Sequence, residues 1–205
     1  MPANKSMRDC DCHFEAHDDA QRKVLRTLLA INGVMFVVEM VVGIFAQSSG
    51  VIADSLDMLA DALVYGVGLY AVGKSAAIKQ RAARWSGVFQ ITLAASILAD
   101  VARRAIQGSE PQSILMMGIA SLALVANAYC LSLLQKHRQG EVHMRASWIF
   151  SRSDVIANAG VILAGSLVWV TGSRWPDLII GTAIAIVVVK GGVDILREAG
   201  RGDSI

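Results

Sequence analysis

The chain has 205 residues, of which 54% are hydrophobic and only 18% are charged. Soluble domains are usually about 45–50% apolar and about 25% charged, so this composition disfavours a cytosolic enzyme and favours a protein that crosses a membrane several times. A formal net charge of +2 is too small to indicate nucleic-acid binding.

The first 22 residues are polar and contain four potential metal ligands. Cys10, Cys12, His13 and His17 lie close together, and thiolate and imidazole groups suit zinc, cadmium or copper(I). This stretch is either a cytoplasmic collector of metal or a polar tail with incidental cysteines. The tail is slightly favoured, because no second pair of ligands follows at a suitable spacing. No apolar signal-peptide core occurs here.

Six largely apolar runs follow, each long enough for a membrane-spanning helix. They cover residues 24–47, 51–73, 85–106, 113–135, 155–173 and 175–196, with polar or small connectors at 47–50, 74–84, 107–112, 136–145 and 172–174. We therefore predict an all-α membrane protein with six transmembrane helices. Its domains would be a polar cytoplasmic tail (1–22), the six-helix transmembrane domain (23–198) and a short cytoplasmic tail (199–205).

The distribution of Lys and Arg predicts the orientation. If both termini share one side, that side and its loops carry 14 basic residues and the other side carries three. Basic residues concentrate on the cytoplasmic side, so both termini are expected in the cytoplasm. The short loops suit a bacterial inner membrane.

Acidic residues in the second run are the first sign of function. A charge at mid-bilayer costs at least about 2.5–3.5 kcal/mol, yet this run contains Asp54, Asp57 and Asp61. Asp57 and Asp61 are four residues apart and share a helical face. Their mutual repulsion is relieved when a divalent cation joins them. Asp54 lies one turn nearer the outside and could line a cation path.

Asp154 is the matching acid in the fifth helix, in the stretch from Ala146 to Asn158. Counted from the cytoplasmic end, it reaches a depth similar to that of Asp61, so carboxylates from two helices are expected to meet. Asn158, one turn further on, could add a carbonyl oxygen. For Glu39, Asp100 and Asn127, packing between helices is the favoured role. Asp177 follows Pro176, which is typical of a helix start.

These residues resemble those of the cation diffusion facilitator family, which exchanges metal cations for protons. The likeness covers residues 24–198 and is specific in two stretches, Ser48-Ser49-Gly50-Val51-Ile52-Ala53-Asp54-Ser55-Leu56-Asp57-Met58-Leu59-Ala60-Asp61 and Asp154-Val155-Ile156-Ala157-Asn158-Ala159-Gly160-Val161-Ile162-Leu163-Ala164-Gly165. Asn32, Glu39 and Gly43 match the spacing of the family's first helix. The region of Pro176-Asp177 and Gly191-Gly192 is similar to its sixth.

The resemblance implies a metal site with two ligands from the second helix and two from the fifth. Asp57 and Asp61 match the first pair, and Asp154 matches the last position. The remaining position falls on Phe150, which cannot coordinate a metal, so Asn158, Ser151, Ser153 or water would complete the site. The family commonly has a soluble C-terminal domain, so this sequence resembles a short form, in which a homodimer would form through the helices or the N-terminal tail.

The sequence therefore predicts a non-enzymatic transporter that exports a divalent metal, such as Zn, Cd, Co, Mn or Fe(II), against protons. It needs no prosthetic group. A non-transporting, metal-sensing or assembly subunit is the alternative. An intramembrane aspartyl protease with an Asp61–Asp154 dyad is a remote one, because the Gly-x-Gly-Asp pattern of that class is missing.

Overall fold

The computed structural model describes residues 5–45, 49–108 and 113–201, and within these ranges it is helical apart from short turns. The elements are α1 (Lys5–Phe45), α2 (Ser49–Ala71), α3 (Ala76–Gln107), α4 (Ser113–Leu134), the single-turn 3-10 helix η1 (Gln135–His137), α5 (Val142–Thr171) and α6 (Trp175–Arg201). The described part of the chain contains no strand, which confirms the all-α prediction.

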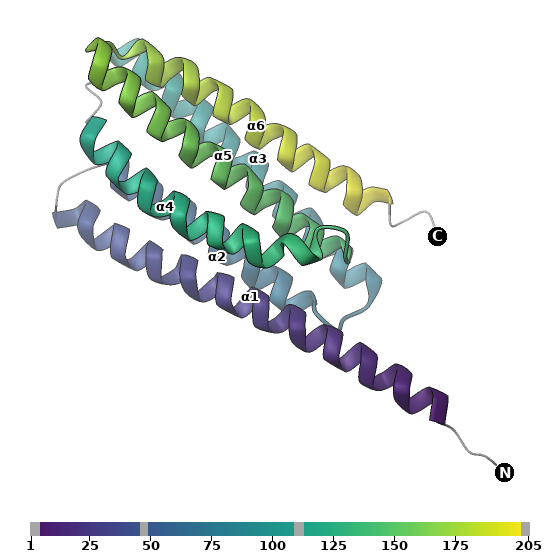
Figure 1. Ribbon diagram of the computed structural model, residues 1–205. Helices are drawn as coiled ribbons and strands as arrows, with labels where there is room; N and C mark the ends of the chain where they lie inside the picture. The colour runs from purple at the N-terminus through teal and green to yellow at the C-terminus, as the bar shows by residue number, and fades with distance from the viewer. Residues whose placement is uncertain (1–4, 46–48, 109–112, 202–205) are drawn as a thin grey trace.

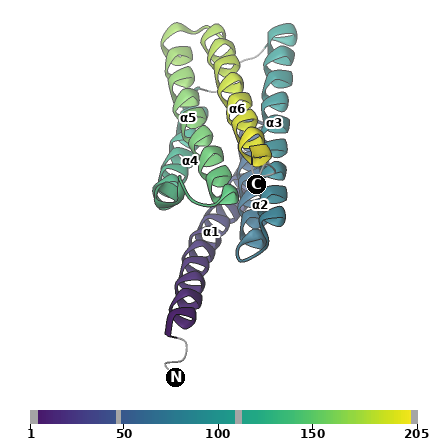
Figure 2. The ribbon, with the colours of Figure 1, turned by 90° about the vertical axis from the view of Figure 1, so that its right-hand side faces the viewer.

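The six long helices form an elongated bundle of neighbouring pairs. The main pairs are α1 with α2, α3 with α6 and α4 with α5, and α5 also packs against α6 (Figure 1). Both ends of the chain lie at one end of the bundle, together with the α2–α3 and α4–α5 turns. We call this the terminal end (Figure 1 and Figure 2). The opposite end holds the last residues of α1, α3 and α5.

Two helices are longer than their apolar runs predicted. α3 begins at Ala76 rather than at residue 85, and α5 begins at Val142, inside the predicted connector 136–145. The predicted connectors 74–84 and 136–145 were therefore wrong where they overlap these helices, at residues 76–84 and 142–145. The cause is that an apolar run marks only the part of a helix that can be embedded in lipid. Ala, Lys, Gln and Arg are strong helix formers and continue the helix in water.

Among the described residues, five helices are long and apolar enough to cross a membrane. These segments are His17–Val42 of α1, Ala76–Gln107, Ser113–His137, Val142–Thr171 and Trp175–Arg201. The 23-residue helix α2 is not among them, and it is the helix that carries Asp54, Asp57 and Asp61.

The largest buried cluster joins the helices near the terminal end. It includes Leu25 and Leu28 of α1, Tyr65 of α2, Cys130 of α4 and Phe150 of α5, all fully buried. A smaller cluster, formed by Ala94, Ile184 and Val188, fixes α3 against α6. The larger cluster sets the positions of α1, α2, α4 and α5 relative to one another.

Candidate functional site

Acids from α2 and α5 come together inside the bundle. Asp61 is only 3% exposed. Its side chain shares a hydrogen bond with Asp154, and the charge of Asp57, one turn earlier on α2, also acts on Asp154. The structure therefore places Asp61 against Asp154, with Asp57 one turn away on α2.

This arrangement is not a finished metal cluster. In the parts of the chain that the structure describes, no group of three or more His, Cys, Asp or Glu side chains is arranged to hold a metal ion. The acids of α2 and α5 therefore lie near one another without forming such a group.

The predicted accessory residues are buried where they are described. Glu39 is 1% exposed, Asn127 is 2% exposed and Asn158 is 8% exposed. The Asn127 Oδ1 atom has no hydrogen-bond partner. Asp54 lies in a part of α2 whose side chains are outside the described residues. Burial suits helix packing as well as a cation path, so the accessory role stays a prediction.

The position expected for a fourth ligand holds an apolar ring. Phe150 is fully buried in the large core cluster, next in sequence to Ser151. Of the hydroxyls predicted to replace the ligand, Ser153 Oγ donates a hydrogen bond to the Ile149 carbonyl oxygen at 3.1 Å. The Ser151 Oγ atom is buried and lies beside the Tyr65 hydroxyl of α2.

Two groups beside the acids were missed by sequence reasoning. Tyr65 of α2 lies within electrostatic range of Asp61, Asp154 and Cys130, and its hydroxyl is next to Ser151. The Tyr65 signal was available, because Tyr65 follows Asp61 by four residues and so shares its helical face. Cys130 gave no such signal, since a single cysteine in an apolar run is usually a packing residue.

A polar cluster links α1, α3 and α5 at the terminal end. Gln21 Nε2 donates hydrogen bonds to His17 Nε2 at 2.8 Å and to Glu141 Oε2 at 3.1 Å. Lys79 forms an ion pair with the other carboxylate oxygen of Glu141. Burial alone would raise the pKa of Glu141, but the hydrogen bonds from Lys79 and Gln21 and the charge of Lys79 lower the pKa below its usual value.

His17 is therefore part of a contact between helices. The side chains of the other predicted capture residues, Cys10, Cys12 and His13, lie outside the described residues. The prediction of metal capture by this segment remains a prediction.

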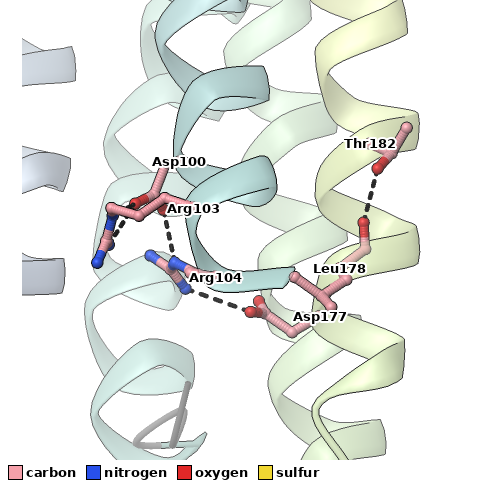
Figure 3. Close-up of polar contacts among 6 residues, drawn as sticks. All are labelled: Asp100, Arg103, Arg104, Asp177, Leu178 and Thr182. Atoms are coloured by element: carbon pink, nitrogen blue, oxygen red, sulfur yellow. Dashed lines mark hydrogen bonds and ion pairs between the residues drawn. The ribbon is translucent and has the colours of Figure 1, made fainter. Parts of the chain in front are cut away.

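The opposite end is joined by a second polar cluster. Arg104, near the end of α3, forms ion pairs with Asp100 of its own helix and with Asp177 in the first turn of α6 (Figure 3). The distance from Arg104 Nη1 to Asp177 Oδ2 is 3.2 Å. Arg103 pairs with Asp100 alone among the residues drawn in Figure 3. The cluster connects α3 to α6, which agrees with the packing role expected for Asp100 and the helix-start role expected for Asp177.

Comparison with protein families gives a match to nearly the whole chain. The family described as cation efflux transmembrane domain matches residues 25–202. That range contains the acids of α2 and α5 and all of the elements from α2 to α6.

Similar curated proteins are bacterial metal transporters by name. The chain is 23% identical to the metal cation efflux system protein CzcD of Cupriavidus metallidurans, over 91% of this chain and 65% of that protein. It is 24% identical to the zinc transporter ZitB of Yersinia pseudotuberculosis, over 88% and 62%. It is 23% identical to a cadmium, cobalt and zinc/H(+)-K(+) antiporter of Bacillus subtilis, over 89% and 63%. The chain thus spans less than two thirds of the length of these relatives.

Proposed function

The chain belongs to the cation efflux family of transmembrane domains, and on this premise we propose that it exports a divalent transition-metal cation from the cytoplasm in exchange for protons. Asp57, Asp61 and Asp154 bind the cation on its way. The observation that carries this proposal is the hydrogen-bonded pair of Asp61 and Asp154, held on separate helices in an apolar bundle.

The pair of Asp61 and Asp154 is suited to exchanging a metal cation for protons. Two carboxyl groups in a medium of low dielectric cannot both be ionised without a neutralising cation. A divalent cation lets both ionise, and its departure leaves them to take up protons. One site thus holds either the metal or protons, which is the requirement for exchange.

In the membrane, we propose that all six helices span the bilayer, with α2 included because its acids face other helices. The terminal end then lies in the cytoplasm, where it carries most Lys and Arg residues. A bacterial inner membrane fits the relatives, which are bacterial. Rocking of helix groups about the acids would open the site to either side in turn.

The relatives narrow the choice of metal. Their names specify zinc, or cadmium, cobalt and zinc. We propose that this chain carries a cation of the same group. The oxygen-rich ligand set also suits harder ions such as Mn(II) and Fe(II), which therefore belong in the same assay.

Uptake of metal into inverted membrane vesicles tests the proposal. Wild-type vesicles should accumulate zinc, cadmium or cobalt and release protons from the lumen when metal enters. Asp61→Asn and Asp154→Asn should abolish uptake. Asp100→Asn is the matched control, because it removes an acid that pairs with Arg103 and Arg104 instead.

Undiminished uptake by the Asp61 and Asp154 variants would remove the site assignment. A folded wild-type chain that binds metal without moving it would favour the metal-sensing alternative.

A further inference from the structure

A row of polar side chains runs along one face of α5, from the terminal end of the bundle to the acids. Its members lie three or four residues apart and so share a helical face: His143, Ser147, Ser151 and Asp154. The first three are at most 1% exposed, and we call them the α5 file. An ionisable side chain buried in such a bundle is costly and marks an ion or proton pathway by default.

Helix α2 borders the α5 file on its other side. A Cβ atom at Gly68 would stand 3.4 Å from Ser147 Oγ, so this hydroxyl lies against the backbone of α2. One turn nearer the acids, Ser151 lies beside the Tyr65 hydroxyl, and the hydrogen-bonded acids follow after it. Hydroxyl groups thus occupy two successive turns between His143 and the acids.

His143 begins the file in the first turn of α5. It is 1% exposed, and neither of its ring nitrogens has a hydrogen-bond partner within the described part of the chain. Ser147 Oγ donates to the His143 carbonyl oxygen at 3.0 Å, so this hydroxyl can still accept a hydrogen bond. A buried polar atom without a partner costs about 1–3 kcal/mol. Ordered water, which commonly satisfies such atoms, would connect the ring to Ser147.

The surroundings of His143 suit a group that takes up a proton and passes it on. The charged or titratable side chains that face the ring come from four elements: Glu141 at the start of α5, Asp18 of α1, Lys79 of α3 and His137 of η1. Arg145 instead pairs with Glu198 of α6, at 3.1 Å. Burial favours the neutral ring, which has a lone pair to accept a proton, and the two carboxylates stabilise the imidazolium against the cationic neighbours.

We propose that the α5 file is the route by which protons leave the acids for the cytoplasm, and that His143 is the proton-transfer residue at its cytoplasmic end. This rests on the proposed function and adds the path of the exchanged proton. The proton that a cation displaces from the acids passes along hydroxyls and ordered water to a ring nitrogen of His143. The imidazolium then loses a proton to solvent near Glu141, whose side chain is 30% exposed. The neutral ring is restored, so the step needs no other reactant.

Proton release by the purified chain tests this route. Rapid mixing with Zn²⁺ in the presence of a pH indicator should show fast release by the wild type. His143→Gln keeps hydrogen-bonding groups but cannot carry a proton. Its release should be slower by about 100-fold, the lower end of what a positioned proton-transfer group contributes. Its affinity for zinc in calorimetry should be unchanged. Equally fast release by this variant would overturn the proposal.

Two serines provide the matched control. Ser147 and Ser86 are both buried, and each donates a hydrogen bond to the carbonyl oxygen four residues earlier in its helix. Ser86 is on α3, which contributes nothing to the α5 file. Ser147→Ala should slow proton release and Ser86→Ala should not, although both remove the same local bond. Equal rates in the two variants would exclude a path through Ser147.

Chemical rescue separates proton transfer from a structural role. His143→Ala leaves a space for the missing ring, so added imidazole should restore its proton release when the free zinc concentration is held constant. The same addition should not restore Ser147→Ala, which still has its ring. Thermal unfolding identifies variants that have lost the fold. Absence of rescue in a folded His143→Ala chain, or equal rescue of both variants, would overturn the role of the ring.

Zinc uptake into inverted vesicles distinguishes this inference from the proposed function. Uptake by His143→Gln should fall together with its proton release. If both stay at the wild-type level, the α5 file is wrong and the exporter stands. Proton release by the wild type without any metal uptake would instead count against transport.

Discussion

Gly192 of α6 lies directly against Gly87 of α3. A Cβ atom at Gly192 would stand 3.2 Å from the Gly87 carbonyl oxygen, 3.3 Å from the Ile91 backbone nitrogen and 2.7 Å from Ile91 Cγ1. Close approach of backbones at small residues is a common way for helices to associate in lipid, where no hydrophobic force drives them together.

We expect Gly192→Ala to destabilise the α3–α6 pair by about 1–3 kcal/mol, because the neighbouring backbone would have to move. Gly200→Ala is the control, since a Cβ at Gly200 of the same helix meets nothing within 4 Å. Both changes raise helix propensity by about 1 kcal/mol. Thermal unfolding in detergent should therefore show a lower midpoint only for Gly192→Ala, and equal midpoints would contradict the close contact.

The Glu141 cluster predicts a pH-dependent contribution to stability. The pKa of Glu141 is lower in the folded chain than in the unfolded chain. Its stabilising contribution is therefore complete above the unfolded pKa of about 4.3 and is lost as the pH falls through the lower, folded value. Glu141→Gln should lower the unfolding midpoint at neutral pH and make progressively less difference below about pH 4.

A substitution of Lys79 tests whether this residue lowers the pKa of Glu141. In a chain with Lys79→Met, the pH dependence of the effect of Glu141→Gln should shrink, because the ion pair is already absent. Equal effects in both backgrounds would assign the lowered pKa to Gln21 instead.

The aromatic ring at position 150 predicts a gain of metal affinity on substitution. Phe150→His places an imidazole four residues before Asp154, on the same face of α5. We expect tighter zinc binding in calorimetry. Without metal, we expect a fold less stable by about 1–3 kcal/mol, because a polar group replaces a buried ring.

Phe89→His is the matched control, since Phe89 packs against the same core cluster from α3. It should lower stability without tightening zinc binding. If Phe150→His binds zinc no more tightly than the wild type, the assignment of position 150 to the ligand set fails.

The two neighbouring arginines of α3 make a second matched pair. Arg104 connects Asp100 to Asp177, whose side chain is 12% exposed, whereas the side chain of Arg103 is 55% exposed. We expect Arg104→Gln to cost about 1 kcal/mol or more, because it leaves a partly buried carboxylate without its partner. Arg103→Gln should change stability by less than about 0.5 kcal/mol. Unfolding midpoints that fall equally would contradict a bridging role.

Much of the fold can be predicted from the sequence, because apolar runs separated by short polar segments usually form membrane-spanning helices. The existence of the helices was predicted, but the starts of α3 and α5 were not. Residues 76–84 and 142–145 include charged or polar side chains, so they were predicted to be connectors. Their residues are helix formers that continue in water, and hydropathy cannot separate a polar helix from a polar connector.

Part of the candidate site could likewise be predicted from the sequence, and part could not. Asp57 and Asp61 could be paired from their spacing, and Asp154 could be placed opposite from its depth in the fifth helix. The neighbours from other helices could not be found. The contact of Cys130 with Asn32 and that of Gln21 with Glu141 depend on how the helices are rotated and staggered against one another, and no local pattern records this.

The length of α1 has a mechanical consequence. This helix has 41 residues and extends beyond the other helices at the terminal end (Figure 1 and Figure 2). It is therefore about 60 Å long, roughly twice the thickness of the hydrocarbon layer. If α1 moves as a rigid body, a rotation of about 5° around its C-terminal end at Phe45 moves Asn32 by about 2 Å. The same rotation moves the N-terminal end of the helix by about 5 Å. A spin label near the N-terminal end of α1 would therefore report tilting of α1 as a larger displacement than a label near Asn32. Such tilting could accompany binding or release of a cation by the acids.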